Sequence, residues 1–351
     1  MSRVERILLG AAAVATVLAG LTRYLHGVSP ILAFGLAALA LAGLAWMVSL
    51  GTEQVGSRFG APVTGALQST VGNLPEFFVV IFALGAHQLV VAQTAILGSI
   101  LVNALLVLGL VIVAGARSAR DGVMRFSPRL PNDTATLLLS STFIIVLIAI
   151  TDGSHDPASH HTKTISLVGA GVLLVVYGAW LWRYLRSDAG PAAGVDPPRL
   201  SMLVSVVLLV VAGTASAFVS DWFVHGLEPT IHKLHISQAF AGLVIVAIAG
   251  NAVENVAGIV LAAKGRSELA IAVVKNSVAQ IAAFLFPVLV LVSLLTATTL
   301  TFSLAPVYAG ALFGAAVLVW QVTGDGEAPV WEGLALVAAY LVLATVAGFE
   351  G

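Results

Sequence analysis

The 351-residue sequence contains no cysteine, and only 9% of its residues are charged. The absence of cysteine excludes disulfide bonds, thiolate metal sites and a cysteine nucleophile. With 16 basic and 17 acidic side chains, the net charge of −1 gives no reason to expect a nucleic-acid partner. Hydrophobic residues make up 59% of the chain, and the mean hydropathy is +1.03. A chain this apolar is predicted to be an integral membrane protein.

Apolar runs of about 20 residues are long enough to cross a bilayer as helices. We expect an all-α polytopic membrane protein with eleven transmembrane helices. The predicted spans are 5–22, 29–50, 60–85, 88–115, 132–151, 164–185, 201–221, 236–263, 268–296, 302–321 and 329–348. The first span follows Arg3 and Arg6 as a signal peptide would, but no small-residue cleavage site precedes the next apolar segment. We therefore interpret it as a retained helix.

Two short motifs repeat inside these apolar spans. GNLPE occupies residues 72–76 and GNAVE occupies residues 250–254, at an offset of 178, and the same offset relates Ser99 to Ser277. This pattern indicates an internal repeat in which spans two to six correspond to spans seven to eleven. Each copy has an odd number of spans, so the second copy enters the membrane from the opposite side, as in the inverted repeats of transporters.

A Pro/Gly-rich hydrophilic stretch from Arg186 to Leu200 separates the two copies. The expected parts are an N-terminal transmembrane helix at 1–25, a first five-helix repeat at 26–186, a cytoplasmic linker at 187–200 and a second five-helix repeat at 201–351. Placing the N-terminus in the cytoplasm puts twelve Lys and Arg residues on that side and three outside. The positive-inside rule therefore predicts an outer C-terminus, and we expect the plasma (inner) membrane.

The motifs combine flexible backbone with polar oxygen atoms. Gly72 and Gly250 let the helices loosen, and Pro75 removes a helical hydrogen bond, which at this depth requires a cavity or protein packing. The candidate cation- and proton-binding residues are Glu76, Glu254, Asn73, Asn251, Ser99, Ser277, Asn103 and Gln280. Rich in oxygen and carrying two negative charges, this set suits a hard cation such as calcium, with Glu76 and Glu254 as the charged metal ligands.

The paired glutamates also suggest how ion and proton movements are coupled. An alternative is that each acid, when protonated, only hydrogen-bonds neighbouring helices, but ionisable residues inside a membrane are costly and here occupy matched positions. Protons and a cation would compete for the same carboxylate oxygens. Such mutual exclusion is what an antiporter needs.

The segments that hold the motifs, residues 64–109 and 240–291, resemble the two alpha-repeats of the calcium/cation antiporter superfamily, specifically its cation/proton exchanger branch. The resemblance extends through the eleven-span layout to nearly the whole chain. It implies secondary active Ca²⁺/H⁺ exchange by alternating access, with Glu76 and Glu254 binding calcium or protons in competition. It also implies a lipid bilayer around the protein, no cofactor besides the transported ions and no enzymatic activity.

Three positions depart from the family pattern. Asn255 stands where a histidine is usual, Asn276 where a glycine precedes the serine, and Lys275 where an apolar residue is expected. One hypothesis is that Lys275 pairs outside the ion pathway. The other is that it is a charge modulator, a tethered cation that reduces the charge of the site. The second hypothesis gives the alternative function, a Na⁺/H⁺ or K⁺/H⁺ antiporter on the same fold.

Two further function classes fit the sequence less well. A channel would need an open polar path, whereas the polar residues form a compact midplane cluster. A metal-dependent intramembrane hydrolase would need histidine ligands at the depth of the glutamates. All eight histidines instead fall in loops on the predicted outer side. There they are either ordinary loop residues or an external pH or metal sensor.

Overall fold

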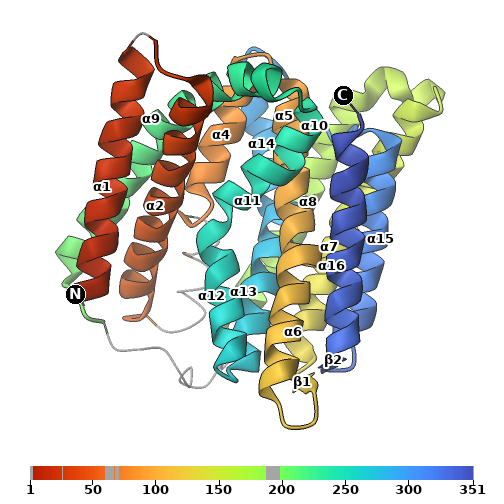
Figure 1. The fold of residues 1–351 in the computed structure, drawn as a ribbon. Helices are drawn as coiled ribbons and strands as arrows, with labels where there is room; N and C mark the ends of the chain where they lie inside the picture. The colour runs from red at the N-terminus through yellow and green to blue at the C-terminus, as the bar shows by residue number, and fades with distance from the viewer. Residues whose placement is uncertain (1–2, 26, 60–66, 68–70, 187–197, 351) are drawn as a thin grey trace. The chain divides into compact units, whose positions relative to one another are not determined.

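The computed structural model describes residues 3–25, 27–59, 67, 71–186 and 198–350 (Figure 1). These residues are almost wholly helical, with one short two-stranded sheet. The predicted class, an all-α polytopic membrane protein, is confirmed. The chain divides into two compact units, which are described separately. Unit 1 comprises residues 1–86 and 178–236, and unit 2 comprises residues 87–177 and 237–351.

Unit 1 is built around two long helices that pack along each other. Its helices are α1 (Arg3–Tyr24), α2 (Pro30–Gly56), α4 (Leu74–Gly85), α9 (Met202–Leu234) and the end of α8 (Thr162–Arg186). Helix α2 packs against both α1 and α9. A Cβ atom on Gly43 would lie 2.7 Å from the Cβ atom of Ala12, and one on Gly51 would lie 2.8 Å from Leu209. Small residues thus let these helices approach closely, as is common in membranes.

The C-terminal end of the predicted linker is fixed to α2 by polar contacts. The buried Gln54 accepts hydrogen bonds through Oε1 from the backbone N–H groups of Arg199, at 2.6 Å, and Leu200, at 3.1 Å. Arg58 Nη2 donates to the carbonyl oxygen of Leu200 at 2.5 Å. The chain therefore enters α9 from a defined position beside the end of α2.

Unit 2 contains the most buried span of the described chain. This span, Leu89–Ser118, runs through α5 (Leu89–Leu101), the π-helix η1 (Val102–Val107) and α6 (Leu108–Ser118). Around it lie α7 (Arg129–Gly153), η2 (Pro157–His161), most of α8, α10 (Gln238–Phe240), η3 (Ala241–Val246), α11 (Ala247–Gly250), α12 (Ala252–Ala263), α13 (Ser267–Gln280), η4 (Ile281–Leu285), α14 (Phe286–Val292), η5 (Ser293–Leu295), α15 (Pro306–Thr323) and α16 (Val330–Gly348).

The predicted number of eleven spans is not confirmed. Among the described residues, nine helices are long and apolar enough to cross a membrane. A tenth span results if the pair Gln238–Gly250 and Asn255–Ala263, bent by 58°, is counted as one. The predicted third span, 60–85, falls partly on residues 60–66 and 68–70, which lie outside the described chain. Its described part is the shorter apolar helix Leu74–Gly85.

The helix bounds support the internal repeat. Helices α4 and α12 each have 12 residues, and an offset of 178 carries the bounds of one onto the other. The same offset carries η1 onto residues 280–285, and the π-helix η4 occupies Ile281–Leu285. Isolated π-helical turns are rare and are frequent at functional sites. Their recurrence at matched positions indicates that the two copies share local backbone structure as well as motifs.

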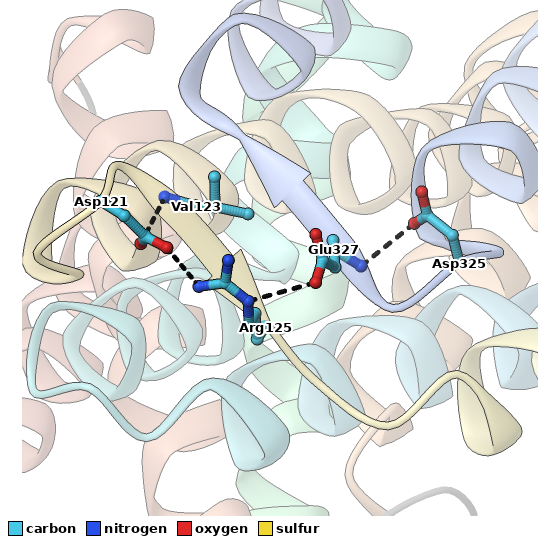
Figure 2. Close-up of polar contacts among 5 residues, drawn as sticks. All are labelled: Asp121, Val123, Arg125, Asp325 and Glu327. Atoms are coloured by element: carbon cyan, nitrogen blue, oxygen red, sulfur yellow. Dashed lines mark hydrogen bonds and ion pairs between the residues drawn. The ribbon is translucent and has the colours of Figure 1, made fainter.

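A short antiparallel ribbon joins two connections of unit 2. Strand β1 (Val123–Arg125) follows α6, and strand β2 (Glu327–Pro329) precedes α16. Figure 2 shows Arg125 between two carboxylates: Nη1 lies 2.6 Å from Asp121 Oδ2, and Nε lies 3.2 Å from Glu327 Oε1. The hydrogen bond from Arg125 lowers the pKa of the exposed Asp121 carboxyl below its ordinary value. The ribbon thereby links the α6–α7 connection to the α15–α16 connection.

Three histidines have a backbone role at helix ends. His87 follows the end of α4, His155 the end of α7 and His235 the end of α9, with φ angles of +61°, +56° and +53°. A residue with left-handed backbone conformation is common just after a helix C-terminus, and that residue is usually glycine. These three residues therefore have a structural role where they stand, while the sensor hypothesis for the outer histidines stays untested.

Candidate cation-binding site

The asparagine of each Gly-Asn motif stands directly before a helix. Asn73 precedes α4 with φ and ψ of −89° and 13°, and Asn251 precedes α12 with −99° and 7°. These nearly equal angles lie in the sparsely populated bridge region, which often holds functional residues. In the second copy the break at Asn251 coincides with the 58° bend. The loosening expected at Gly250 therefore takes the form of a helix break.

Unit 1 places Glu76 in the first turn of α4. Both Glu76 and Asn73 are buried. The N-terminal end of a helix carries partial positive charge, which stabilises a carboxylate there. Ser220 Oγ of α9 donates to the carbonyl oxygen of Pro75 at 3.4 Å and attaches this first turn to α9. The start of α4 thus gives the predicted acidic residue a fixed and electrostatically favourable position.

Unit 2 brings together predicted site residues from both repeats. Asn251 Nδ2 donates hydrogen bonds to Ser99 Oγ and to the carbonyl oxygen of Ala247, both at 2.9 Å. Asn103 Nδ2 donates to Asn251 Oδ1 and to the carbonyl oxygen of Ser99, also at 2.9 Å. Ser99, Asn103 and Asn251 are all buried. The first and second repeats therefore meet in one polar cluster, the Ser99–Asn103–Asn251 cluster.

Two glycines make this meeting geometrically feasible. Helix α5 crosses η3 at Gly98 and Gly242, one from each repeat. A Cβ atom on Gly98 would lie 2.5 Å from the carbonyl oxygen of Leu243, and one on Gly242 would lie 2.9 Å from that of Val91. Because Gly98 precedes Ser99, the close crossing positions the serine hydroxyl beside Asn251. Neither glycine was predicted as a site residue, although glycine inside an apolar helix is a signal of close helix packing.

The remaining predicted residues of unit 2 lie on α13. Ser277, Gln280 and Lys275 are all buried there. The Nζ atom of Lys275 donates to Thr323 Oγ1 at 3.2 Å. Thr323 belongs to the last turn of α15, where the helix dipole stabilises a cation. Two residues turn a helix by about 200°, so Lys275 and Ser277 point to nearly opposite sides of α13. This contact favours the hypothesis that Lys275 pairs outside the pathway.

Glu254 belongs to α12, three residues after Asn251, but its side chain lies outside the described residues. Its position relative to the other candidates therefore stays a prediction. Within the part of the chain that is described, there is no group of three or more His, Cys, Asp or Glu side chains that could hold a metal ion. Among the described candidate residues, the oxygen atoms that could act as metal ligands belong mainly to neutral amide and hydroxyl groups. Glu76 adds a carboxylate.

Comparison with protein families gives one extended match. The model of the sodium/calcium exchanger protein family matches residues 29–185 and 204–349. The chain is 31% identical over 316 residues to a vacuolar calcium ion transporter of Schizosaccharomyces pombe, covering 87% of this chain and 76% of that protein. It is 28% identical over 356 residues to the Ca²⁺/H⁺ antiporter ChaA of Bacillus subtilis, covering 98% of each.

Solved structures extend this similarity to three dimensions. The structure of native YfkE has a TM-score of 0.81 and 26% identity, covering 98% of this chain and 99% of that chain. The H⁺/Ca²⁺ exchanger CAX has a TM-score of 0.76 over 98% of this chain and 92% of its own, at 16% identity, and indicates a shared fold. The similarity covers nearly the whole length of each protein.

Proposed function

Because the chain belongs to the sodium/calcium exchanger protein family, we propose that it is a secondary active antiporter that exchanges Ca²⁺ for H⁺. The observation that carries the proposal is similarity along 98% of both chains to a protein named a Ca²⁺/H⁺ antiporter. The family match includes both predicted repeats, and the predicted resemblance to cation/proton exchangers is confirmed.

The residues of the two Gly-Asn motifs are the candidates for the chemistry that exchange requires. We propose that Glu76 and Glu254 bind either calcium or protons, because both would occupy the same carboxylate oxygens. Calcium takes about six to eight oxygen ligands in flexible geometry. The buried oxygens of the Ser99–Asn103–Asn251 cluster, with those of Ser277 and Gln280, would supply neutral ligands from unit 2, and Asn73 would supply one from unit 1.

Coupling would follow from mutual exclusion. A site loaded with calcium or with protons is close to neutral, whereas an empty site with two carboxylates would cross a low-dielectric region at a high cost. Alternating access, in which the first two and the sixth and seventh predicted spans slide against a fixed core, would then move one substrate in each direction. We further propose a cytoplasmic N-terminus and an outer C-terminus in the plasma membrane, from the distribution of Lys and Arg.

The alternative Na⁺/H⁺ or K⁺/H⁺ function depends on Lys275 lowering the charge of the site. The contact between Lys275 and Thr323 of α15 does not favour it. Calcium is therefore the substrate to test first.

The test is proton flux in sealed proteoliposomes that contain a trapped pH dye and purified protein. Calcium, manganese, sodium and potassium are added in turn, with protein-free liposomes as the control. We expect calcium to give the largest response, saturating with concentration and moving protons opposite to the cation. A response confined to sodium or potassium would favour the alternative function, and cation uptake without proton movement would contradict antiport.

A further inference from the structure

Three asparagines of unit 2, Asn103, Asn255 and Asn276, have a buried Oδ1 atom without a hydrogen-bond partner within the described part of the chain. Asn103 is already a predicted ligand, whereas Asn255 and Asn276 are not. Buried polar atoms are nearly always hydrogen-bonded, because leaving one unsatisfied destabilises the fold. Asn251 offers the contrast, since its amide group bonds to Ser99, Asn103 and the Ala247 carbonyl. The unsatisfied oxygens of Asn255 and Asn276 therefore require an explanation.

Both oxygens belong to one helical hairpin. Asn255 lies on α12 directly after Glu254, and Asn276 lies on α13 directly before Ser277. Helices α12 and α13 pack against each other, and a Cβ atom on Gly258 would lie 3.0 Å from Val274 Cγ2. Asn255 lies three residues and Asn276 two residues farther from the α12–α13 connection than this contact, so the two asparagines lie at similar levels along the hairpin. Each asparagine is therefore adjacent in sequence to a predicted ligand of the second repeat, Glu254 or Ser277.

The first repeat has no counterpart of this pair. The 178-residue offset places Phe77 opposite Asn255 and Gly98 opposite Asn276. Phe77 packs edge-on against Phe78, and Gly98 fills the close crossing with η3. Of the six asparagines in the sequence, only Asn132 lies outside the two repeat segments 64–109 and 240–291. The extra amides are therefore specific to the second copy of the candidate site.

We propose that Asn255 and Asn276 are further cation-binding residues, whose side-chain oxygens contact the transported calcium ion or the water bound to it. This inference rests on the proposed function and extends it. An amide oxygen is a suitable ligand for calcium and carries no charge. The two residues would therefore raise calcium affinity without binding a transported proton, and they would make the second-repeat side of the site richer in oxygen than the first.

Replacement by leucine, which has a similar size, separates a binding role from a packing role. Removing an unsatisfied buried acceptor leaves no partner unpaired, so Asn255→Leu and Asn276→Leu should keep or raise the melting temperature. The same changes should raise the calcium KM of proton flux at least about fivefold each, roughly 1 kcal/mol. The pH profile at saturating calcium should stay unchanged, because an amide does not titrate.

Two matched variants serve as controls. Asn132→Leu changes an exposed asparagine on α7 and should alter neither the melting temperature nor the KM. Asn251→Leu breaks existing hydrogen bonds and should lower the melting temperature. Alanine variants at positions 255 and 276 repeat the measurement with less added bulk, in case leucine disturbs the packing.

Radioactive calcium binding to the detergent-solubilised protein provides a readout that does not depend on proton flux. Weaker binding with an undiminished melting temperature in both variants supports the proposal. Unchanged affinity in both would overturn it, as would a lowered melting temperature with unchanged affinity, which indicates a packing role. In those cases calcium-driven flux by the unmodified protein would still support the proposed function. An unmodified protein that neither binds calcium nor exchanges it would contradict both.

Discussion

Asn251 and Ser99 are 152 residues apart in the sequence, yet Asn251 Nδ2 donates a hydrogen bond to Ser99 Oγ at 2.9 Å. The contact joins the helix break at Asn251 in the second repeat to α5 in the first repeat. It is buried, and Asn103 reinforces it by donating to Asn251 Oδ1. A transporter built from two copies of one motif therefore has a polar connection between the copies within unit 2.

The first prediction concerns this connection. Asn251→Ala should lower the free energy of unfolding by about 2 kcal/mol, because it leaves a buried donor of Asn103 with one partner fewer. Ser99→Ala should lower the free energy of unfolding by a smaller amount. In a double-mutant cycle with thermal unfolding in detergent, the two changes should couple by about 0.5 to 1.5 kcal/mol. Strict additivity would show that the bond contributes nothing to stability.

The second prediction concerns the helix crossing that positions Ser99. Gly98→Ala would place a methyl group 2.5 Å from the carbonyl oxygen of Leu243, so α5 and η3 must separate. We expect a loss of about 1 to 3 kcal/mol in stability together with a large loss of exchange. Gly310→Ala on α15 is the control, because nothing lies within 4 Å of its added Cβ. If the two variants have equal stability and equal exchange activity, the close crossing of α5 and η3 does not position the site.

The third prediction tests the role of Lys275. Lys275→Met removes an ammonium whose partner, Thr323, keeps its own hydrogen bond to the Val319 carbonyl. If Lys275 pairs outside the pathway, stability should be equal or higher, and the preference for calcium over sodium should change by less than about threefold, roughly 0.6 kcal/mol. Lys163→Met, at an exposed lysine, controls for the loss of charge. A larger change in ion preference would instead support a charge modulator.

The fourth prediction concerns pH and the ribbon in Figure 2. Hydrogen bonding by Arg125 lowers the pKa of Asp121 in the folded protein. A carboxyl with a lowered folded pKa stabilises the fold above its unfolded pKa of about 4, and this effect is lost as the pH falls through the folded pKa. Asp121→Asn should therefore lower the melting temperature slightly at neutral pH, and the difference should vanish in acid. The exposed Asp133→Asn variant is the control. A difference in melting temperature that persists in acid would show that the Asp121 carboxylate is not the source of the stabilisation.

Much of the architecture could be predicted because its signals are local. Composition indicates the membrane, and the repeated motif gives the 178-residue offset that relates α4 to α12. Helix ends were harder to predict. The predicted span 201–221 marks apolar residues, whereas α9 continues to Leu234 through a more polar segment. Hydropathy detects the part of a helix that lies in lipid and not the point where its hydrogen bonds end.

The contacts of the candidate site could be predicted only in part. The types of residue followed from the motifs, but the partner of Lys275 is 48 residues away on another helix, and no local pattern identifies Thr323. Strands β1 and β2 have three residues each and are too short for a periodicity signal. The close approach at Gly98 likewise depends on a segment distant in sequence.

The central claim is that Glu76 and Glu254 carry calcium and protons in turn. Its most direct test is calcium-driven proton flux in proteoliposomes with Glu76→Gln and Glu254→Gln, since glutamine mimics the protonated acid. Glu228→Gln, at an exposed position of α9, is the matched control. We predict that each site variant keeps its melting temperature and loses exchange, while the control exchanges normally. Near-normal exchange by either site variant would contradict the account.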